Sequence, residues 1–262
     1  MTSAARRVLV TGGTGTLGRV LTPMLAAAGH EVTILSRQPS AGPATATRSV
    51  GADLVRGDGV GAPVSEAEVV VHLATANGRR DVDMMRTLAA AARGGGADRP
   101  PLLLYLSIVG CDKIPLPYYR HKHEAERIAL DSGLPVTVLR STQFHPLVDR
   151  LFSSQRRLPW LLVPDIPLQP VDLGEVAQRL VELVSRPAGG RVADLGGPEV
   201  KPLLEFATLW RQAHGRRGRR LPLRLPGPTF AAFRAGHQLV PGAARDGRSF
   251  AEYLSVPPAD SR

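Results

Sequence analysis

Short apolar runs alternate with amphipathic stretches over the first 140 residues of the chain. An apolar run of strand length followed by a stretch of helical periodicity is typical of a βαβ unit. Gly29 and Gly94 are placed to end the first two helices, and Pro117 to begin the third. Strands are predicted at residues 8–11, 31–35, 53–56, 68–73, 102–106 and 135–139, and helices at 16–28, 81–93 and 118–132.

The strands are apolar along nearly their whole length, as strands of a parallel sheet covered on both faces must be. Right-handed crossovers then predict an α/β fold with a doubly wound, Rossmann-like parallel sheet. After residue 140 the alternation breaks into a Pro-rich, aromatic stretch. We therefore predict a dinucleotide-binding core at 1–145 and, at 146–262, mostly a small C-terminal substrate cap. A core helix and strand return near 171–196 within one integrated domain.

Composition is that of a globular protein, with 43% hydrophobic and 21% charged residues among 262. The single cysteine, Cys111, makes no internal disulfide. We find no secretory signal and no apolar stretch near the ~18 residues of a membrane span. A cytoplasmic protein without a membrane partner is expected, either monomer or homodimer.

The net charge is +10, from 33 basic and 23 acidic residues. Only three of the basic residues are lysines, and the rest are arginines spread along the chain. This bias is more typical of a coding preference than of a nucleic-acid-binding stripe, so a nucleic-acid partner is not expected. Residues 211–224 are rich in arginine and contain no acid. These residues either bind an acidic surface of a partner or form a solvated loop.

A glycine-rich turn follows the first strand and opens the first helix. It reads Thr11-Gly12-Gly13-Thr14-Gly15-Thr16-Leu17-Gly18 and fits both G-x-x-G-x-x-G and G-x-G-x-x-G. Such glycines allow a tight turn, close backbone approach to a diphosphate and close helix–strand packing, while the helix N-terminus supplies NH donors. We predict that the cofactor is bound here by Gly12, Thr14, Gly15, Thr16, Leu17 and Gly18.

The cofactor preference is predicted from the end of the second strand. NAD-selective sites place an acid about 20 residues after the loop, but this chain has Leu35-Ser36-Arg37 there. Arg37 can bind a 2′-phosphate as a fork, and Ser36 adds a hydroxyl donor. NADP(H) is therefore predicted over NAD(H), unless Arg37 is merely one of many surface arginines.

Tyr118 and Lys122 are four residues apart on the third predicted helix, hence on one face. A nearby ammonium lowers a tyrosine pKa, which lets the phenol exchange a proton with a carbonyl or alcohol oxygen. Ser107, at the end of the fifth strand, can bind the same oxygen, and Lys122 can also hold the cofactor ribose. The alternative is a solvent-facing helix on which Tyr118 packs and Lys122 pairs with Glu126.

With these motifs the chain resembles an atypical short-chain dehydrogenase/reductase of the NmrA-like NAD(P)H-binding family. The resemblance rests on the glycine turn, Gly57-Asp58, His72-Leu73-Ala74-Thr75, Leu106-Ser107-Ile108-Val109-Gly110 and Tyr118-Tyr119-Arg120-His121-Lys122. It implies that Asp58 lies near the adenine and Ala74 and Thr75 near the adenosine ribose. It also implies that the segment containing Thr142 and Phe144 lines the nicotinamide.

The leading hypothesis is an NADP(H)-dependent oxidoreductase that reduces a carbonyl, enone or quinone of a small, partly apolar molecule. The alternatives are a non-catalytic NADP(H) sensor of the NmrA type and a cofactor-dependent epimerase or dehydratase. No spacing of His, Asp or Glu predicts a metal site. Candidate walls of the substrate pocket are Phe144, Phe152, Trp160 and Leu161.

Overall fold

The computed structural model describes residues 4–39, 47–94, 99–216, 218–240, 242 and 247–256. The chain divides into two compact units. The first unit comprises Met1–Ser107, Pro117–Arg140 and Val176–Ala193, and the second comprises Ile108–Leu116, Ser141–Glu175 and Asp194–Arg262. The predicted core and cap boundary at residue 145 stays a prediction.

A parallel, seven-stranded sheet in the order β3-β2-β1-β4-β5-β6-β9 forms the centre of the first unit. The order reverses beside β1, so the predicted doubly wound Rossmann-like fold is confirmed. The strands are β1 (Arg7–Thr11), β2 (Glu31–Ser36), β3 (Thr47–Gly51), β4 (Val69–His72), β5 (Leu102–Ile108), β6 (Val136–Ser141) and β9 (Gly190–Arg191).

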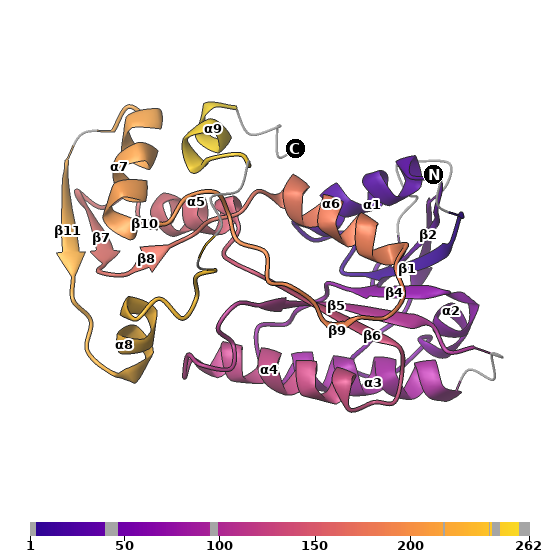
Figure 1. Ribbon diagram of the computed structural model, residues 1–262. Coiled ribbons are helices and arrows are strands. Elements are labelled where there is room, and N and C mark those ends of the chain that lie inside the picture. The colour runs from indigo at the N-terminus through magenta and orange to yellow at the C-terminus, as the bar shows by residue number, and fades with distance from the viewer. Residues whose placement is uncertain are drawn as a thin grey trace. The chain divides into compact units, whose positions relative to one another are not determined.

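Helices cover both faces of this sheet (Figure 1). On one face α3 and α4 lie side by side, and α1 lies on the other. Residues such as Leu9, Met85 and Leu103 are fully buried between the sheet and α3. The helices with residues in the first unit are α1 (Gly18–Ala27), α2 (Gly61–Glu66), α3 (Arg80–Gly94), α4 (Pro117–Leu130) and α6 (Leu173–Val184).

The third strand departs from the sequence prediction, which put it at residues 53–56. The structure has β3 at Thr47–Gly51, an edge strand whose residues are exposed or half-buried. An edge strand lacks the continuous apolar run that marks buried strands, so hydrophobicity did not reveal it. Residues 53–58 instead form a turn in which the Asp53 carboxylate accepts hydrogen bonds from the NH groups of Val55 and Arg56.

A buried ion pair ties α4 to β6. The Arg140 guanidinium donates to both carboxylate oxygens of Glu126, at 2.9 and 2.8 Å, and both side chains are 3% exposed. Arg140 thus engages both oxygens of the Glu126 carboxylate, and the alternative pairing of Lys122 with Glu126 stays a prediction. This fork geometry is the strong form of a charge-assisted hydrogen bond.

The second unit has its own core, made by α5, β7, α7 and α9. Phe152 and Leu161, predicted as pocket walls, are buried in this core, whereas Trp160 is exposed. The described elements of this unit are α5 (His145–Ser153), β7 (Trp160–Pro164), β8 (Pro167–Leu168), β10 (Lys201–Pro202), α7 (Leu203–Ala213), β11 (Arg219–Leu223), α8 (Pro228–Arg234) and α9 (Phe250–Ser255). Among the helices that the structure describes, none has the length and apolar character needed to cross a bilayer.

Candidate functional site

The glycine turn packs against β4 as the motif requires. Gly12 has φ +72°, and a Cβ added there would lie 2.7 Å from the Ala74 nitrogen. A Cβ on Gly18 would collide with the backbone of Gly12 and Gly13. Both positions therefore exclude any side chain, and α1 begins directly against the end of β1.

The same turn presents unused backbone donors. The Gly15 NH donates to the Gly12 carbonyl at 3.0 Å, which closes the turn. Within the described residues, the NH groups of Thr14, Thr16, Leu17 and Gly18 donate to no backbone carbonyl, and no side chain caps α1. A helix N-terminus with open NH groups favours an anion, so these residues fit a dinucleotide diphosphate.

Arg19 is an additional candidate that the sequence analysis did not single out. Its Nε donates to the Thr14 carbonyl at 2.9 Å, and the side chain lies exposed beside the turn. The signal in the sequence was a cation directly after the last glycine of the motif. We expect its guanidinium to add positive charge at the diphosphate.

At the end of β2, Asp53 lies near Arg37, the predicted ligand of the 2′-phosphate. Backbone hydrogen bonds from Val55 and Arg56 lower the pKa of Asp53, and the charges of Arg56 and Arg37 lower it further. Counting along β2 could not reveal Asp53, because it comes from the turn after β3. Exposed Arg37 therefore belongs to a mixed cluster with Asp53 and Arg56 rather than to an isolated basic site.

Ser36 and Asp58 have local backbone roles in the same region. The Ser36 hydroxyl donates to the Gln38 carbonyl at 3.1 Å and accepts from the Gln38 NH at 3.2 Å. Asp58 is exposed, and its carbonyl accepts from the Asp53 NH at 2.9 Å. The backbone of Asp58 thus closes the turn that begins at Asp53, and the predicted role of Asp58 at the adenine stays a prediction.

The hydroxyl of Tyr118 lies next to the hydroxyl of Thr75. The Tyr118 hydroxyl is 3.5 Å from the Thr75 hydroxyl, which donates to the buried carboxylate of Asp81 at 2.7 Å. Asp81 also accepts a hydrogen bond from the Ala76 NH at 2.5 Å. Residues from the loop after β4, from α3 and from α4 thus form a connected chain from a carboxylate to the phenol.

The direction of the Tyr118 pKa differs from the sequence expectation. Burial raises the pKa of Tyr118, the hydrogen bond with Thr75 lowers it in part, and the Asp81 charge raises it further. The predicted lowering of this pKa is wrong in direction, because burial outweighs the hydrogen bond with Thr75. A raised pKa keeps the phenol protonated at neutral pH, as a proton donor requires.

Lys122 is a buried residue of α4 that contacts β5. Its Nζ donates to the Leu106 carbonyl at 3.3 Å and lies 4.8 Å from the centre of the Tyr105 ring. Ser107 is buried on the neighbouring position of β5. Lys122 and Ser107 therefore belong to the same unit as Tyr118. The contacts of Lys122 given above are with Leu106 and Tyr105 of β5.

Burial, with a smaller contribution from Lys122, lowers the pKa of His72 to about 3. The unfolded chain then binds one more proton than the folded chain as the pH falls below 6.5. Because of this one proton, we expect the free energy of unfolding to fall by about 1.4 kcal/mol for each pH unit below 6.5. Urea unfolding between pH 7 and 5 should show a shallower slope for His72→Asn, and an unchanged slope would contradict this assignment.

Thr142 and Phe144 lie in the second unit. The Thr142 hydroxyl donates to the Gln169 carbonyl at 2.5 Å and accepts from the Gly197 NH at 3.3 Å, so it joins two segments of that unit. Phe144 pairs with Val171 and precedes α5. Between them, the amide atoms of Gln143 are buried without a hydrogen-bond partner among the described residues. Gln143 thus offers unused donors and acceptors in the segment predicted to line the nicotinamide.

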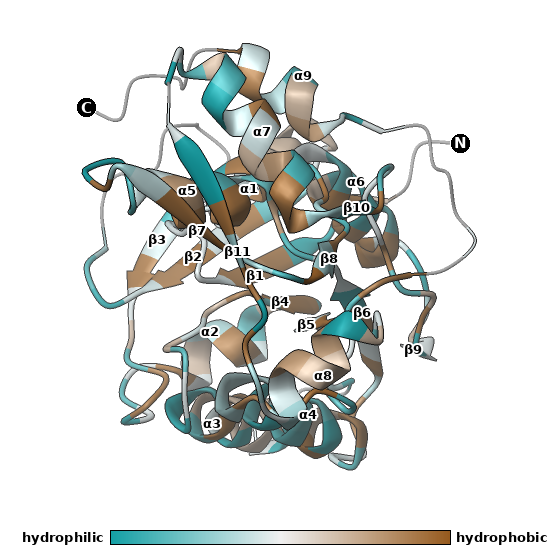
Figure 2. Ribbon diagram, turned by 90° about the vertical axis from the view of Figure 1, so that its left-hand side faces the viewer, coloured by the Kyte–Doolittle hydropathy of each residue, from teal (hydrophilic) through white to brown (hydrophobic). Residues whose placement is uncertain are grey.

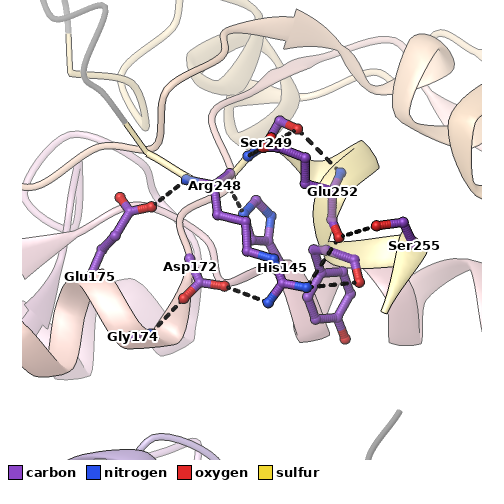
Figure 3. Close-up of polar contacts among 9 residues, drawn as sticks. His145, Asp172, Gly174, Glu175, Arg248, Ser249, Glu252 and Ser255 are labelled. Atoms are coloured by element: carbon purple, nitrogen blue, oxygen red, sulfur yellow. Dashed lines mark hydrogen bonds and ion pairs between the residues drawn. The ribbon is translucent and has the colours of Figure 1, made fainter. Parts of the chain in front are cut away.

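A second polar cluster holds α9 within the second unit (Figure 3). The Arg248 guanidinium lies 3.5 Å from Asp172, and the Arg248 NH donates to Glu175 at 2.7 Å. Nε2 of buried His145 is 2.9 Å from the Arg248 carbonyl, and the ring stacks on Tyr253. These contacts fix the segment before α9, so we assign this cluster a structural role.

Together, the doubly wound sheet and the open glycine turn define a dinucleotide-binding protein. A family model described as NAD(P)H-binding matches residues 12–146. The chain belongs to this NAD(P)H-binding family of atypical, NmrA-like short-chain dehydrogenases/reductases.

The chain is similar to known proteins at low sequence identity. An uncharacterized protein of Mycobacterium tuberculosis is 25% identical over 230 residues, which cover 78% of this chain and 26% of that protein. This chain thus spans about a quarter of the length of the curated relatives it matches. The NADPH-dependent quinone oxidoreductase of Escherichia coli, solved with NADPH, has a TM-score of 0.79 at 18% identity over 95% of this chain and 98% of its own.

A nucleoside-diphosphate-sugar epimerase of Staphylococcus aureus has a TM-score of 0.75 at 15% identity, over 95% of this chain and 100% of its own. At such identities these likenesses show the fold, which carries several chemistries. The choice between reductase and epimerase must therefore come from the residues of the site.

Proposed function

We propose that this protein is an NADP(H)-dependent oxidoreductase that reduces a carbonyl, enone or quinone group of a small, partly apolar molecule. The observation that carries the proposal is the Tyr118 hydroxyl, 3.5 Å from Thr75, in the same compact unit as the glycine turn. Family membership supports the nucleotide, and the protonated phenol supports the direction of reduction.

The cofactor is held by residues of the first unit. The open NH groups from Thr14 to Gly18 bind the diphosphate, Arg37 with Ser36 binds the 2′-phosphate, and Asp58 lies at the adenine. Ala74 and Thr75 border the adenosine ribose. When bound, NADPH supplies the hydride.

The protein supplies and positions the proton. Tyr118 donates it to the substrate oxygen, so that one hydride and one proton convert a carbonyl into an alcohol or a quinone into a hydroquinone. Ser107 hydrogen-bonds the same oxygen, and Lys122 holds the ribose of the nicotinamide half. Solvent then returns a proton to the tyrosinate. Thr75, fixed by Asp81, positions the phenol.

Arg37→Ala is expected to weaken NADPH binding by about 1–3 kcal/mol and to spare NADH, because only NADPH carries the 2′-phosphate. Calorimetric titration with both nucleotides measures the difference. Arg7→Ala is the matched control, since Arg7 begins β1 and lies at the N-terminal end of the strands, whereas Arg37 follows the C-terminal end of β2. Equal losses for both nucleotides in Arg37→Ala would remove Arg37 from the phosphate site and leave Asp53 as the ribose ligand.

A non-catalytic NADP(H) sensor is the second candidate. It is favoured by the contacts of Lys122 with Leu106 and the Tyr105 ring, because they direct the ammonium toward β5. An epimerase or dehydratase, the activities named for two structural neighbours, would use the same nucleotide site.

A substrate screen separates these candidates. Oxidation of NADPH is followed at its absorbance band with quinones, enones and ketones, and binding is measured in parallel. The reductase proposal expects turnover of at least one class. Nucleotide binding without oxidation across the whole screen would favour the sensor instead.

A further inference from the structure

The small parallel sheet of β7 and β11 has two faces of different character. Leu161 and Val163 of β7 are buried against α7 in the core of the second unit. Because side chains alternate along a strand, the residues between them point the other way. The residues on that side, which we call the outer face, are Trp160, Leu162 and Pro164 with their register partners Arg219, Leu221 and Leu223.

Large apolar side chains are exposed on the outer face. Trp160 is 54% exposed and Leu221 is 47% exposed, and Leu162 pairs in register with Leu221. Exposed Leu158 directly precedes this part of β7. Single exposed leucines are ordinary, but an indole and two leucines on adjacent strands form a contiguous apolar surface.

Arginines border this surface at one end. The sequence Arg-Arg-Leu-Pro occurs twice here, directly before β7 at residues 156–159 and as the first four residues of β11 at 219–222. Arg156, Arg157 and Arg219 are exposed, and Figure 2 looks toward β7 and β11 from this side. The exposed acid Asp165 follows β7 at the opposite end. Of the arginine-rich segment 211–224, for which an acidic-surface contact and a solvated loop were the alternatives, residues 219–223 form strand β11, and Arg217 lies outside the described residues.

We propose that the outer face docks the protein peripherally on an anionic lipid bilayer. Indole rings favour the headgroup level, leucines enter the acyl boundary, and arginines bind lipid phosphates while their stems cover apolar surface. A second copy of this chain is a poor occupant, because it would place arginines against arginines in a protein of net charge +10. The proposal departs from the sequence expectation of no membrane partner, and it needs no spanning helix.

Tryptophan fluorescence tests this docking directly. The chain has two tryptophans, of which Trp210 is 2% exposed and hydrogen-bonded to Asp149. Full-length protein is titrated with vesicles of phosphatidylcholine alone or with about 30% phosphatidylglycerol. We expect a blue shift and quenching by brominated acyl chains only with the anionic vesicles, and loss of both signals in Trp160→Phe.

Two pairs of variants separate docking from general electrostatic attraction. Leu162→Ser with Leu221→Ser should weaken vesicle binding about tenfold or more, whereas Val200→Ser, also at an exposed apolar position, should not. Arg219→Glu should weaken binding more than Arg186→Glu, which makes the same charge change elsewhere. The proposal is overturned if anionic vesicles are not bound, as with a purely proteinaceous partner, or if each variant behaves like its control.

Discussion

Tyr118→Phe is expected to lower kcat about 10²–10⁴-fold, because the substrate oxygen loses its proton donor while the ring and its packing remain. The measurement is the rate of NADPH oxidation with a substrate found in the screen. NADPH affinity should stay close to that of the wild type, since the phenol hydroxyl is not placed at the diphosphate or at the 2′-phosphate.

Tyr119→Phe provides the matched control, as it removes a hydroxyl from the adjacent, buried residue of α4. Thr75→Val should lower kcat less than Tyr118→Phe does, and it should alter the pH profile, because the contact with Thr75 acts on the pKa of Tyr118. If Tyr118→Phe retains full turnover, the proton must come from another group.

Arg140→Met is expected to reduce the free energy of unfolding by about 3–5 kcal/mol, because it removes the guanidinium that donates to both oxygens of the buried Glu126 carboxylate. The double variant Glu126→Leu with Arg140→Met should recover most of this loss, since neither charge then remains buried. Urea unfolding at pH 7 measures all three proteins. A double variant as unstable as Arg140→Met would show that the loss comes from packing rather than from the removal of the guanidinium from the carboxylate.

The parts of the fold with strong local signals were predictable from the sequence. These signals lie within a few residues of the feature that they predict. They are the glycine turn, Gly29 with φ +87° after α1, and Pro117 at the start of α4. Strand β3 was missed because an edge strand has no apolar run. Strand β11 was missed because its alternating arginine, leucine and proline residues pair only with the distant β7.

For the candidate site, the sequence supplied the residue types but not their electrostatics. The spacing of Tyr118 and Lys122 suggested that the ammonium controls the phenol. In the structure, the groups that act on the pKa of Tyr118 include Asp81 and Thr75. These residues are 37 and 43 positions from Tyr118 along the chain. The interaction of Asp53 with Arg37 was likewise not predictable, because Asp53 comes from the turn after β3 and Arg37 from the end of β2. Spacing along one helix cannot report contacts that the sheet brings together.

The central claim is that the backbone amides of the glycine turn bind a dinucleotide diphosphate. Calorimetric titration of NADPH into the wild type, Gly15→Ala and Gly61→Ala tests it most directly. A Cβ at Gly15 would lie 3.1 Å from the Gly12 carbonyl, a small adjustment, whereas one at Gly61 meets open space. We expect binding to the wild type and Gly61→Ala, and a loss of about tenfold or more in Gly15→Ala at an unchanged melting temperature. Absence of binding to the wild type, or equal affinity in Gly15→Ala, would contradict the account.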